Sequence, residues 1–264
     1  MNEKSNKDLN NFYNQVYVKG EKKHFTIKRE SVSLSEIKEV LKQVSWKNKK
    51  VLDVGCGTGL FAFSVAKKGA TVLGIDFSSE AIEIAKSKHI HKNLQFTSSD
   101  IHTIKEKFDV IVSNGTLEHM DNPLKTLRLL KNHLNKNGCI VITSPNWTNP
   151  RGHMLIPLML LFDAPITLVD LHYFTPIDFK NFAKKLDMKL SWKTFDQSWG
   201  NGKILVEDFK KRIPNVLRDA KLPNDPKKIN LLIKWIEKNI SSMNNDLPHT
   251  GATGLYKLTL KKNS

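Results

Sequence analysis

Short apolar runs alternate with amphipathic segments between Lys49 and about Leu190, which predicts a parallel sheet covered by helices on both faces. Continuous apolar runs such as Phe108–Ser113 are typical of strands with both faces buried. We therefore predict an α/β fold with a doubly wound, mostly parallel, seven-stranded sheet and helical insertions. The predicted strands are 51–54, 70–76, 93–99, 108–113, 139–143, 189–195 and 255–260.

Capping residues and hydrophobic stripes mark the predicted helices. Ser78 or Ser79 caps one helix, and Asn122–Pro123 and Thr175–Pro176 are cap and first-turn pairs that open two more. The helix at 33–44 is expected to pack beside the first strand. The predicted helices are 33–44, 60–68, 79–88, 123 to before Gly138, 176–186 and 229–240.

The chain divides into three parts by pattern. Residues 1–45 are predicted to form an N-terminal helical cap, and residues 46–198 an α/β core with a lid at 146–174. Residues 199–264 are predicted to add a helical insertion and a closing edge strand. A length of 264 residues suits one large domain with such additions.

Composition bears on the cellular compartment of the protein and on the kind of partner that it binds. No apolar run reaches the roughly 18 residues that a membrane-spanning helix needs, so we expect a cytoplasmic protein in which Cys56 and Cys139 are free thiols. The net charge of +16 favours an anionic partner, but only 5 of the 42 basic residues are arginine. Solvated surface is therefore the preferred interpretation of the lysines, ahead of attraction to acidic lipid or substrate, and sequence-specific RNA binding ranks third.

The segment Val51–Gly59 carries the strongest chemical signal. It reads as a strand ending in Asp53, followed by a bend with glycine at 55, 57 and 59 that exposes bare backbone before a helix. A dinucleotide-binding G-x-G-x-x-G pattern starting at Gly55 would need glycine where Leu60 stands, so NAD is disfavoured. No metal site is predicted.

This segment resembles the first motif of class I S-adenosylmethionine-dependent methyltransferases, and Asp76 stands at the expected distance at the end of the next strand. The resemblance implies a Rossmann-like fold and S-adenosyl-L-methionine as cofactor. It implies that the loop holds the amino-acid part of the cofactor and Asp76 the ribose; Asp76 could instead only cap a helix. The implied cofactor-binding residues are Asp53, Gly55, Cys56, Gly57, Gly59, Asp76, Phe77, Asp100, Ile101 and Asn114.

A Leu117-Glu118-His119 run after the fourth strand resembles the O-methyltransferases of ubiquinone biosynthesis. The resemblance extends over about 49–190 and implies an O-methylation in which His119 deprotonates an acceptor hydroxyl. A free histidine, with a pKa of about 6.5, can do this near neutral pH. In the alternative interpretation, Glu118 and His119 only fix the loop.

The apolar segment 152–174 favours a small-molecule or lipophilic acceptor, reached under a lid that could also contact a membrane surface peripherally. An ordinary core helix explains the same pattern. Two other functions stay open: an RNA or other N-methyltransferase, and a non-catalytic cofactor-binding scaffold. Asn114-Gly115 lacks the Pro-Pro that base-amino methylation usually requires.

Overall fold

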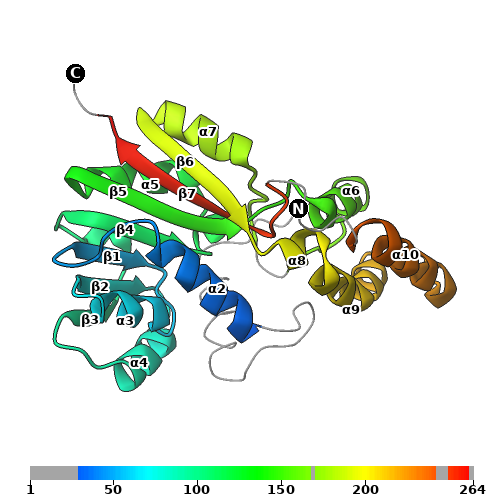
Figure 1. Cartoon of the computed structure of the whole chain (residues 1–264), viewed down its shortest axis with the longest axis horizontal. Coiled ribbons are helices and arrows are strands. Elements are labelled where there is room, and N and C mark those ends of the chain that lie inside the picture. Colours follow the sequence, from blue (N-terminus) through cyan, green and yellow to red (C-terminus); the bar gives the residue numbers. More distant parts are fainter. Residues whose placement is uncertain (1–28, 168–169, 242–248, 262–264) are drawn as a thin grey trace.

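A single sheet of seven strands runs through the described part of the molecule, which comprises residues 29–167, 170–241 and 249–261 of a computed structural model (Figure 1). The strand order is β3-β2-β1-β4-β5-β7-β6, and β1 to β5 are parallel. This arrangement confirms the predicted fold class. The strands are β1 (Lys50–Val54), β2 (Thr71–Asp76), β3 (Leu94–Ser98), β4 (Phe108–Asn114), β5 (Leu134–Pro145), β6 (Met188–Phe195) and β7 (Thr253–Leu260).

Helices cover both faces of the sheet. Helices α2, α3 and α4 contribute to the apolar core on one face, and α5 and α7 to that on the other. The helices are α2 (Arg29–Leu41), α3 (Leu60–Ala66), α4 (Ser79–Lys88), α5 (Pro123–Asn132), α6 (Pro150–Phe162), α7 (Pro176–Lys185), α8 (Gln197–Asn201), α9 (Lys203–Asp219) and α10 (Pro226–Asn239), with short 3₁₀ turns η1 (Ile101–Thr103) and η2 (Leu117–His119).

The predicted caps occur where the sequence places them. The Ser78 hydroxyl accepts from the backbone N–H of Ala81, and the Asn122 side chain accepts from that of Lys125. Thr175 opens α7 with a capping box in which the Asp178 carboxylate accepts from the Thr175 backbone N–H at 2.8 Å. These caps fix the residue at which each helix begins.

The last strand is not at the edge, which corrects the prediction of a closing edge strand. Strand β7 lies between β5 and β6 and is antiparallel to both. Leu255 packs into the core on one face, and Tyr256 and Leu258 pack on the other. Apolar and polar residues alternate in both β6 and β7, so the pattern alone did not distinguish the edge strand from the inner one.

Strand β5 begins earlier than predicted, at Leu134 instead of Cys139. The register shifts where Phe108 pairs with Leu134 but Val110 pairs with Cys139, so the intervening residues form an irregularity in the ladder. The turn-forming Asn137-Gly138 therefore lies within the strand, and α5 ends at Asn132.

Beyond the carboxyl ends of the parallel strands, α6, α8, α9 and α10 form a helical lobe (Figure 1). Its own apolar core includes Leu155 of α6, Phe209 and Ile213 of α9 and Ile236 of α10. The predicted lid and the predicted helical insertion thus share one core, which the sequence did not indicate.

Helix α2 lies across more of the sheet than the predicted contact with the first strand. Its Ile37 and Val40 share a core with Val51 of β1. In addition, the Glu36 carboxylate bonds to the hydroxyl of Thr143 in β5, and Lys193 of β6 pairs with Glu39. The rest of the predicted N-terminal cap, residues 1–28, lies outside the described residues.

Candidate active site

The glycine loop between β1 and α3 has the left-handed backbone that its glycines allow. The φ angles are 72° at Gly55, 51° at Gly57 and 85° at Gly59. A Cβ on Gly55 would lie 2.4 Å from the Thr116 hydroxyl, and one on Gly59 would lie 2.5 Å from the Phe96 ring. Packing within the chain therefore explains two of the glycines, in addition to any ligand.

The Asp76 carboxylate ties two strand ends together. One oxygen accepts from the backbone N–H of Gly57 at 2.8 Å, and the other accepts from that of Ser78 at 2.9 Å. Asp76 does not cap α4, because Ser78 does. Each carboxylate oxygen has a second lone pair, so Asp76 can accept further hydrogen bonds from ligand hydroxyls.

Asp53 is buried without a compensating cation. Its side chain is 2% exposed, and Oδ2 has no hydrogen-bond partner among the described residues. Burial, followed by the charges of Asp76 and Glu36, raises the pKa of Asp53 to about 8. Burial also raises the pKa of Asp76. An added positive charge would favour the ionised form of both carboxyls.

Glu36, from α2, is a third carboxyl at this site and was missed in the sequence. Burial raises its pKa, which the hydrogen bond from Thr143 opposes. Glu36 is four residues before Val40, so it lies on the apolar side of an amphipathic helix. A carboxyl on the buried side is a signal that could have revealed it.

The remaining predicted cofactor residues follow neighbouring strands. Asp100 comes after β3 and accepts from the backbone N–H of His102 at 2.8 Å, beside the buried Ile101. Phe77, after β2, is 41% exposed, and Asn114 ends β4. Burial raises the pKa of Cys56, so its thiol is a neutral part of the loop. These predicted residues all lie at the carboxyl ends of parallel strands, where open α/β sheets bind ligands.

The 3₁₀ turn η2 carries His119 and is held by the segment 170–172. The backbone N–H groups of Leu171 and His172 donate to the Glu118 carbonyl at 3.0 and 3.1 Å. Asp170 Oδ1 lies 3.6 Å from His119 Nδ1, and sequence reasoning missed this partner. The only signal was its position just before the His172-Tyr173-Phe174 motif.

Glu118 is buried beside the same aspartate. It is 2% exposed, and Oε2 has no hydrogen-bond partner in the described structure. Burial, followed by the charge of Asp170, raises the pKa of Glu118 well above its usual range, which favours its protonated form. Burial also raises the pKa of Asp170, although His119 and two arginines oppose this shift. Asp170 is therefore the carboxyl placed to orient His119.

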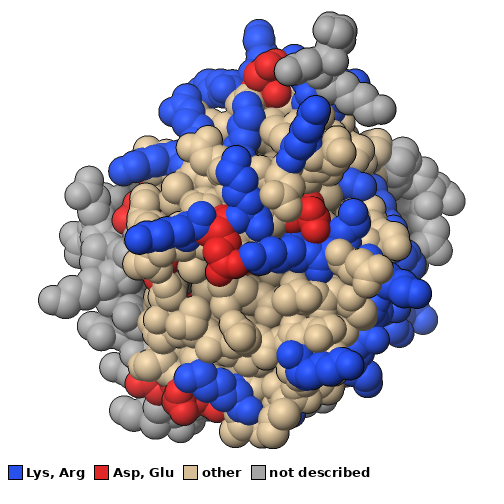
Figure 2. All heavy atoms as spheres, turned by 90° about the vertical axis from the view of Figure 1, so that its left-hand side faces the viewer, with Lys and Arg blue, Asp and Glu red and all other residues tan. Residues whose placement is uncertain are grey.

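One group of surface lysines lies at the end of the sheet away from these residues. Figure 2 shows the end of the molecule where the parallel strands begin, with lysines and arginines spread among acidic side chains. Lys49, Lys107 and Lys136 are exposed near the starts of β1, β4 and β5. Because the glycine loop lies at the opposite end of the sheet, these lysines do not line the candidate site.

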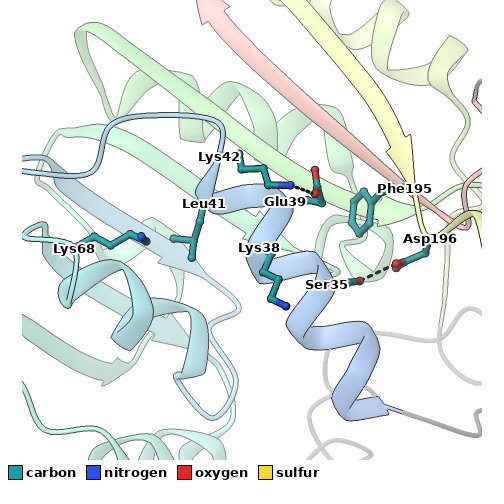
Figure 3. Close-up of a pocket in the computed structure, with 8 residues that line it drawn as sticks. All are labelled: Ser35, Lys38, Glu39, Leu41, Lys42, Lys68, Phe195 and Asp196. Atoms are coloured by element: carbon teal, nitrogen blue, oxygen red, sulfur yellow. Dashed lines mark hydrogen bonds and ion pairs between the residues drawn. The ribbon is translucent and has the colours of Figure 1, made fainter.

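A hollow of about 500 Å³ lies between α2, the residues after α3 and the end of β6 (Figure 3). Several of its polar groups pair with one another: Ser35 donates to Asp196 at 2.7 Å, and Lys42 lies 2.5 Å from Glu39. Its lining includes none of the predicted site residues, so it is separate from the candidate site. The lining residues are Ser35, Lys38, Glu39, Leu41, Lys42, Lys68, Phe195 and Asp196.

No cluster of three metal-binding side chains occurs among the residues for which coordinates are described. The same part of the chain contains no helix long and apolar enough to cross a membrane.

Comparison with known proteins identifies the domain. Residues 45–172 match the family described as "Methyltransferase domain". This part of the chain is similar to a methyltransferase domain. An O-methyltransferase of ubiquinone biosynthesis from Haemophilus ducreyi is 39% identical over 118 residues, covering 41% of this chain and 50% of that protein. The chain thus matches only about half the length of that relative.

Solved structures with low sequence identity share the fold of the methyltransferase domain. An S-adenosylmethionine-dependent methyltransferase from Archaeoglobus fulgidus aligns with a TM-score of 0.58 at 17% identity, covering 94% of this chain and 99% of that chain. The magnesium protoporphyrin IX methyltransferase of Synechocystis aligns with a TM-score of 0.57 at 14% identity, covering 71% and 91%. The predicted family resemblance is confirmed, while the individual site residues stay predictions.

The raised pKa of Asp53 predicts how stability depends on pH. An unfolded aspartate titrates near pH 4, so between about pH 4 and pH 8 the folded protein binds the proton more tightly, and stability falls as the pH rises. We expect Asp53→Asn to abolish about 2 kcal/mol of the loss between pH 6 and pH 8. Urea unfolding at several pH values measures this.

The exposed Asp163, whose left-handed backbone suits asparagine, provides the matched control. Asp163→Asn should keep the wild-type dependence. An Asp53→Asn protein with that same dependence would contradict the assignment.

Proposed function

We propose that this chain is an S-adenosylmethionine-dependent methyltransferase that methylates a hydroxyl group of a small or lipophilic molecule. The observation that carries the proposal is the set of three carboxyls beside the glycine loop, each with a raised pKa: Asp53 and Asp76, which are buried, and Glu36, which is half-buried. Buried acids with raised pKa values favour a cationic ligand. S-Adenosylmethionine is such a ligand, and when bound it supplies an electrophilic methyl group on a sulfonium.

The proposed cofactor contacts follow the strand ends. Asp53, Glu36 and the loop at 55–59 hold the amino-acid part through charge and backbone N–H groups. Asp76 accepts from the ribose hydroxyls with the lone pairs that Gly57 and Ser78 leave available. Phe77, Asp100 and Ile101 contact the adenine, and Asn114 lines the methionine end. The contact given for each of these residues is part of the proposal.

His119 is proposed as the general base, with Asp170 as its positioning residue. Asp170 Oδ1 lies 3.6 Å from His119 Nδ1, which is close enough to orient the ring. The other ring nitrogen would then take the proton of the acceptor hydroxyl. Bound S-adenosylmethionine would supply the methyl group to the hydroxyl oxygen and keep the electron pair of the broken carbon–sulfur bond. The name of the Haemophilus ducreyi relative supports a hydroxyl acceptor.

We also propose that the enzyme works in the cytoplasm and contacts a membrane surface peripherally. Leu160 and Leu161 at the end of α6 are 71% and 73% exposed, and α10 exposes Leu231 and Trp235. Lys234 is exposed beside them on α10. Apolar side chains next to lysines are typical of segments that lie on anionic lipid.

Calorimetry with S-adenosylhomocysteine tests the cofactor site. The wild-type chain should bind, and Asp76→Ala should lose at least about tenfold in affinity, a change of about 1.4 kcal/mol. Glu36→Gln keeps a group that can bond to Thr143 but removes the charge, so it should weaken binding while the fold is retained. Asp163→Asn is the control. Wild-type protein that does not bind the nucleoside would refute the cofactor assignment.

Transfer of a radiolabelled methyl group tests the reaction. Phenolic and lipophilic hydroxyl compounds should accept the label, whereas RNA should not. With an acceptor in hand, His119→Ala should lower kcat by about 10²-fold or more without changing the affinity for S-adenosylhomocysteine. Asp170→Asn should reduce kcat less and alter its pH profile. An unchanged turnover in His119→Ala would leave this residue structural.

Sedimentation with vesicles tests the membrane contact. Vesicles containing phosphatidylserine should bind the protein at low salt, and vesicles of phosphatidylcholine alone should bind it less. The double variant Leu160→Ser, Leu161→Ser should reduce binding, while Asp163→Asn should not. Equal sedimentation of wild type and double variant would exclude α6 as the contact.

A further inference from the structure

Arg151 is held in a fixed, buried position at the start of α6. It is 5% exposed, and the loop before it is fastened to the far end of the chain. The side-chain amides of Asn146 and Asn149 donate to the Gly251 carbonyl at 2.8 and 3.1 Å, and Asn149 also accepts from the backbone N–H of Gly152 at 2.9 Å. This frame fixes the backbone that carries Arg151.

The Arg151 guanidinium contacts aromatic rings, and two of its three nitrogens have no hydrogen-bond acceptor among the described residues. Its central carbon lies 4.7 Å from the centre of the Trp147 ring and 5.2 Å from that of Trp199. Its Nε and Nη2 are buried with no hydrogen-bond partner among the described residues. A buried cation without acceptors is costly, because water has been removed and nothing replaces it.

Arg212, the nearest comparison in the same lobe, shows what a satisfied buried arginine looks like. Its Nε and Nη2 donate to the two carboxylate oxygens of Asp208 at 2.7 and 2.9 Å, and Nη1 donates to the Ile166 carbonyl at 2.8 Å. Burial lowers the pKa of Arg151 to about 10, so Arg151 is still charged at neutral pH. Nε and Nη2 of Arg151 thus lack the hydrogen-bond acceptors that the same two atoms of Arg212 have.

The two tryptophans whose rings contact Arg151 add two more hydrogen-bond donors. The indole nitrogens of Trp147 and Trp199 are also buried with no hydrogen-bond partner in the part of the chain described. An indole nitrogen only donates, as does a guanidinium. One stacked cluster therefore combines three donor groups that lack acceptors, which suits a group with several oxygen acceptors and a negative charge.

Asp170 connects this cluster with the proposed base. It lies 3.6 Å from His119, and its charge also acts on Arg151. We propose that Arg151, with Trp147 and Trp199, binds a carboxylate on the methyl acceptor, so that the substrate is a hydroxy acid whose hydroxyl points to His119. This inference rests on the proposed function, and it adds the substrate class.

A matched pair of catechols tests the inference: 3,4-dihydroxybenzoate, which carries the carboxylate, and 3,4-dihydroxybenzamide, which does not. The wild-type enzyme should show a KM for the acid at least about tenfold below that for the amide, as a charge-assisted hydrogen bond implies. Arg151→Gln should raise the KM for the acid at least about tenfold and leave the amide unchanged. Arg151→Lys, which keeps the charge but loses the planar fork, should fall between them.

Arg218→Gln removes the same charge from an exposed position on α9 and should behave as wild type. Calorimetry of 3,4-dihydroxybenzoate with S-adenosylhomocysteine present gives a readout without turnover, and Arg151→Gln should lose this binding while it still binds S-adenosylhomocysteine. If the wild-type protein does not bind S-adenosylhomocysteine, the proposed function is refuted, and this outcome is distinct from failure of the inference about Arg151. Equal wild-type KM values for acid and amide would overturn the inference, even if Arg151→Gln does not fold.

Discussion

The burial of two carboxyls at the carboxyl ends of β1 and β2 is the constraint on which the candidate site depends. Asp53 and Asp76 are carried there by strands whose other residues are largely buried, and Glu36 arrives from α2. Burial, followed by the charges of Asp76 and Glu36, makes ionisation of Asp53 costly and raises its pKa to about 8. Asp76 offsets part of its own cost by accepting two backbone N–H groups, and in doing so it fixes the glycine loop.

A second set of contacts joins the sheet to the helical lobe. The backbone at 171–172 donates to η2, and Asp170 of the same segment pairs with His119. Asn146 and Asn149 tie the start of the lobe to Gly251, next to β7. Groups from the sheet and from the lobe thus meet around His119, so the orientation of the lobe determines which acceptor groups can approach it.

The sequence predicted local features well, but it did not predict contacts between residues that lie far apart in the chain. The glycine loop, the caps at Ser78 and Asn122 and the class of sheet follow from residue types at fixed spacing, and the structure has them. The contacts of Glu36 with Thr143 and of Asp170 with His119 join residues 107 and 51 positions apart. No periodicity encodes such contacts, and the inner position of β7 was missed because both β6 and β7 alternate.

In the proposed chemistry, the carboxyls of Glu36, Asp53 and Asp76 contribute to cofactor affinity and not to the rate of methyl transfer. Transfer of the methyl group removes the positive charge of the sulfonium, so carboxylates that stabilised that charge would bind the reactant better than the transition state and slow the reaction. The ammonium of the amino-acid part keeps its charge throughout. Carboxylates directed at the ammonium bind reactant and product alike, which strengthens affinity without changing the chemical barrier. In the proposed reaction, rate enhancement must then come from alignment of the acceptor and from proton removal, the role proposed for His119 beside Asp170.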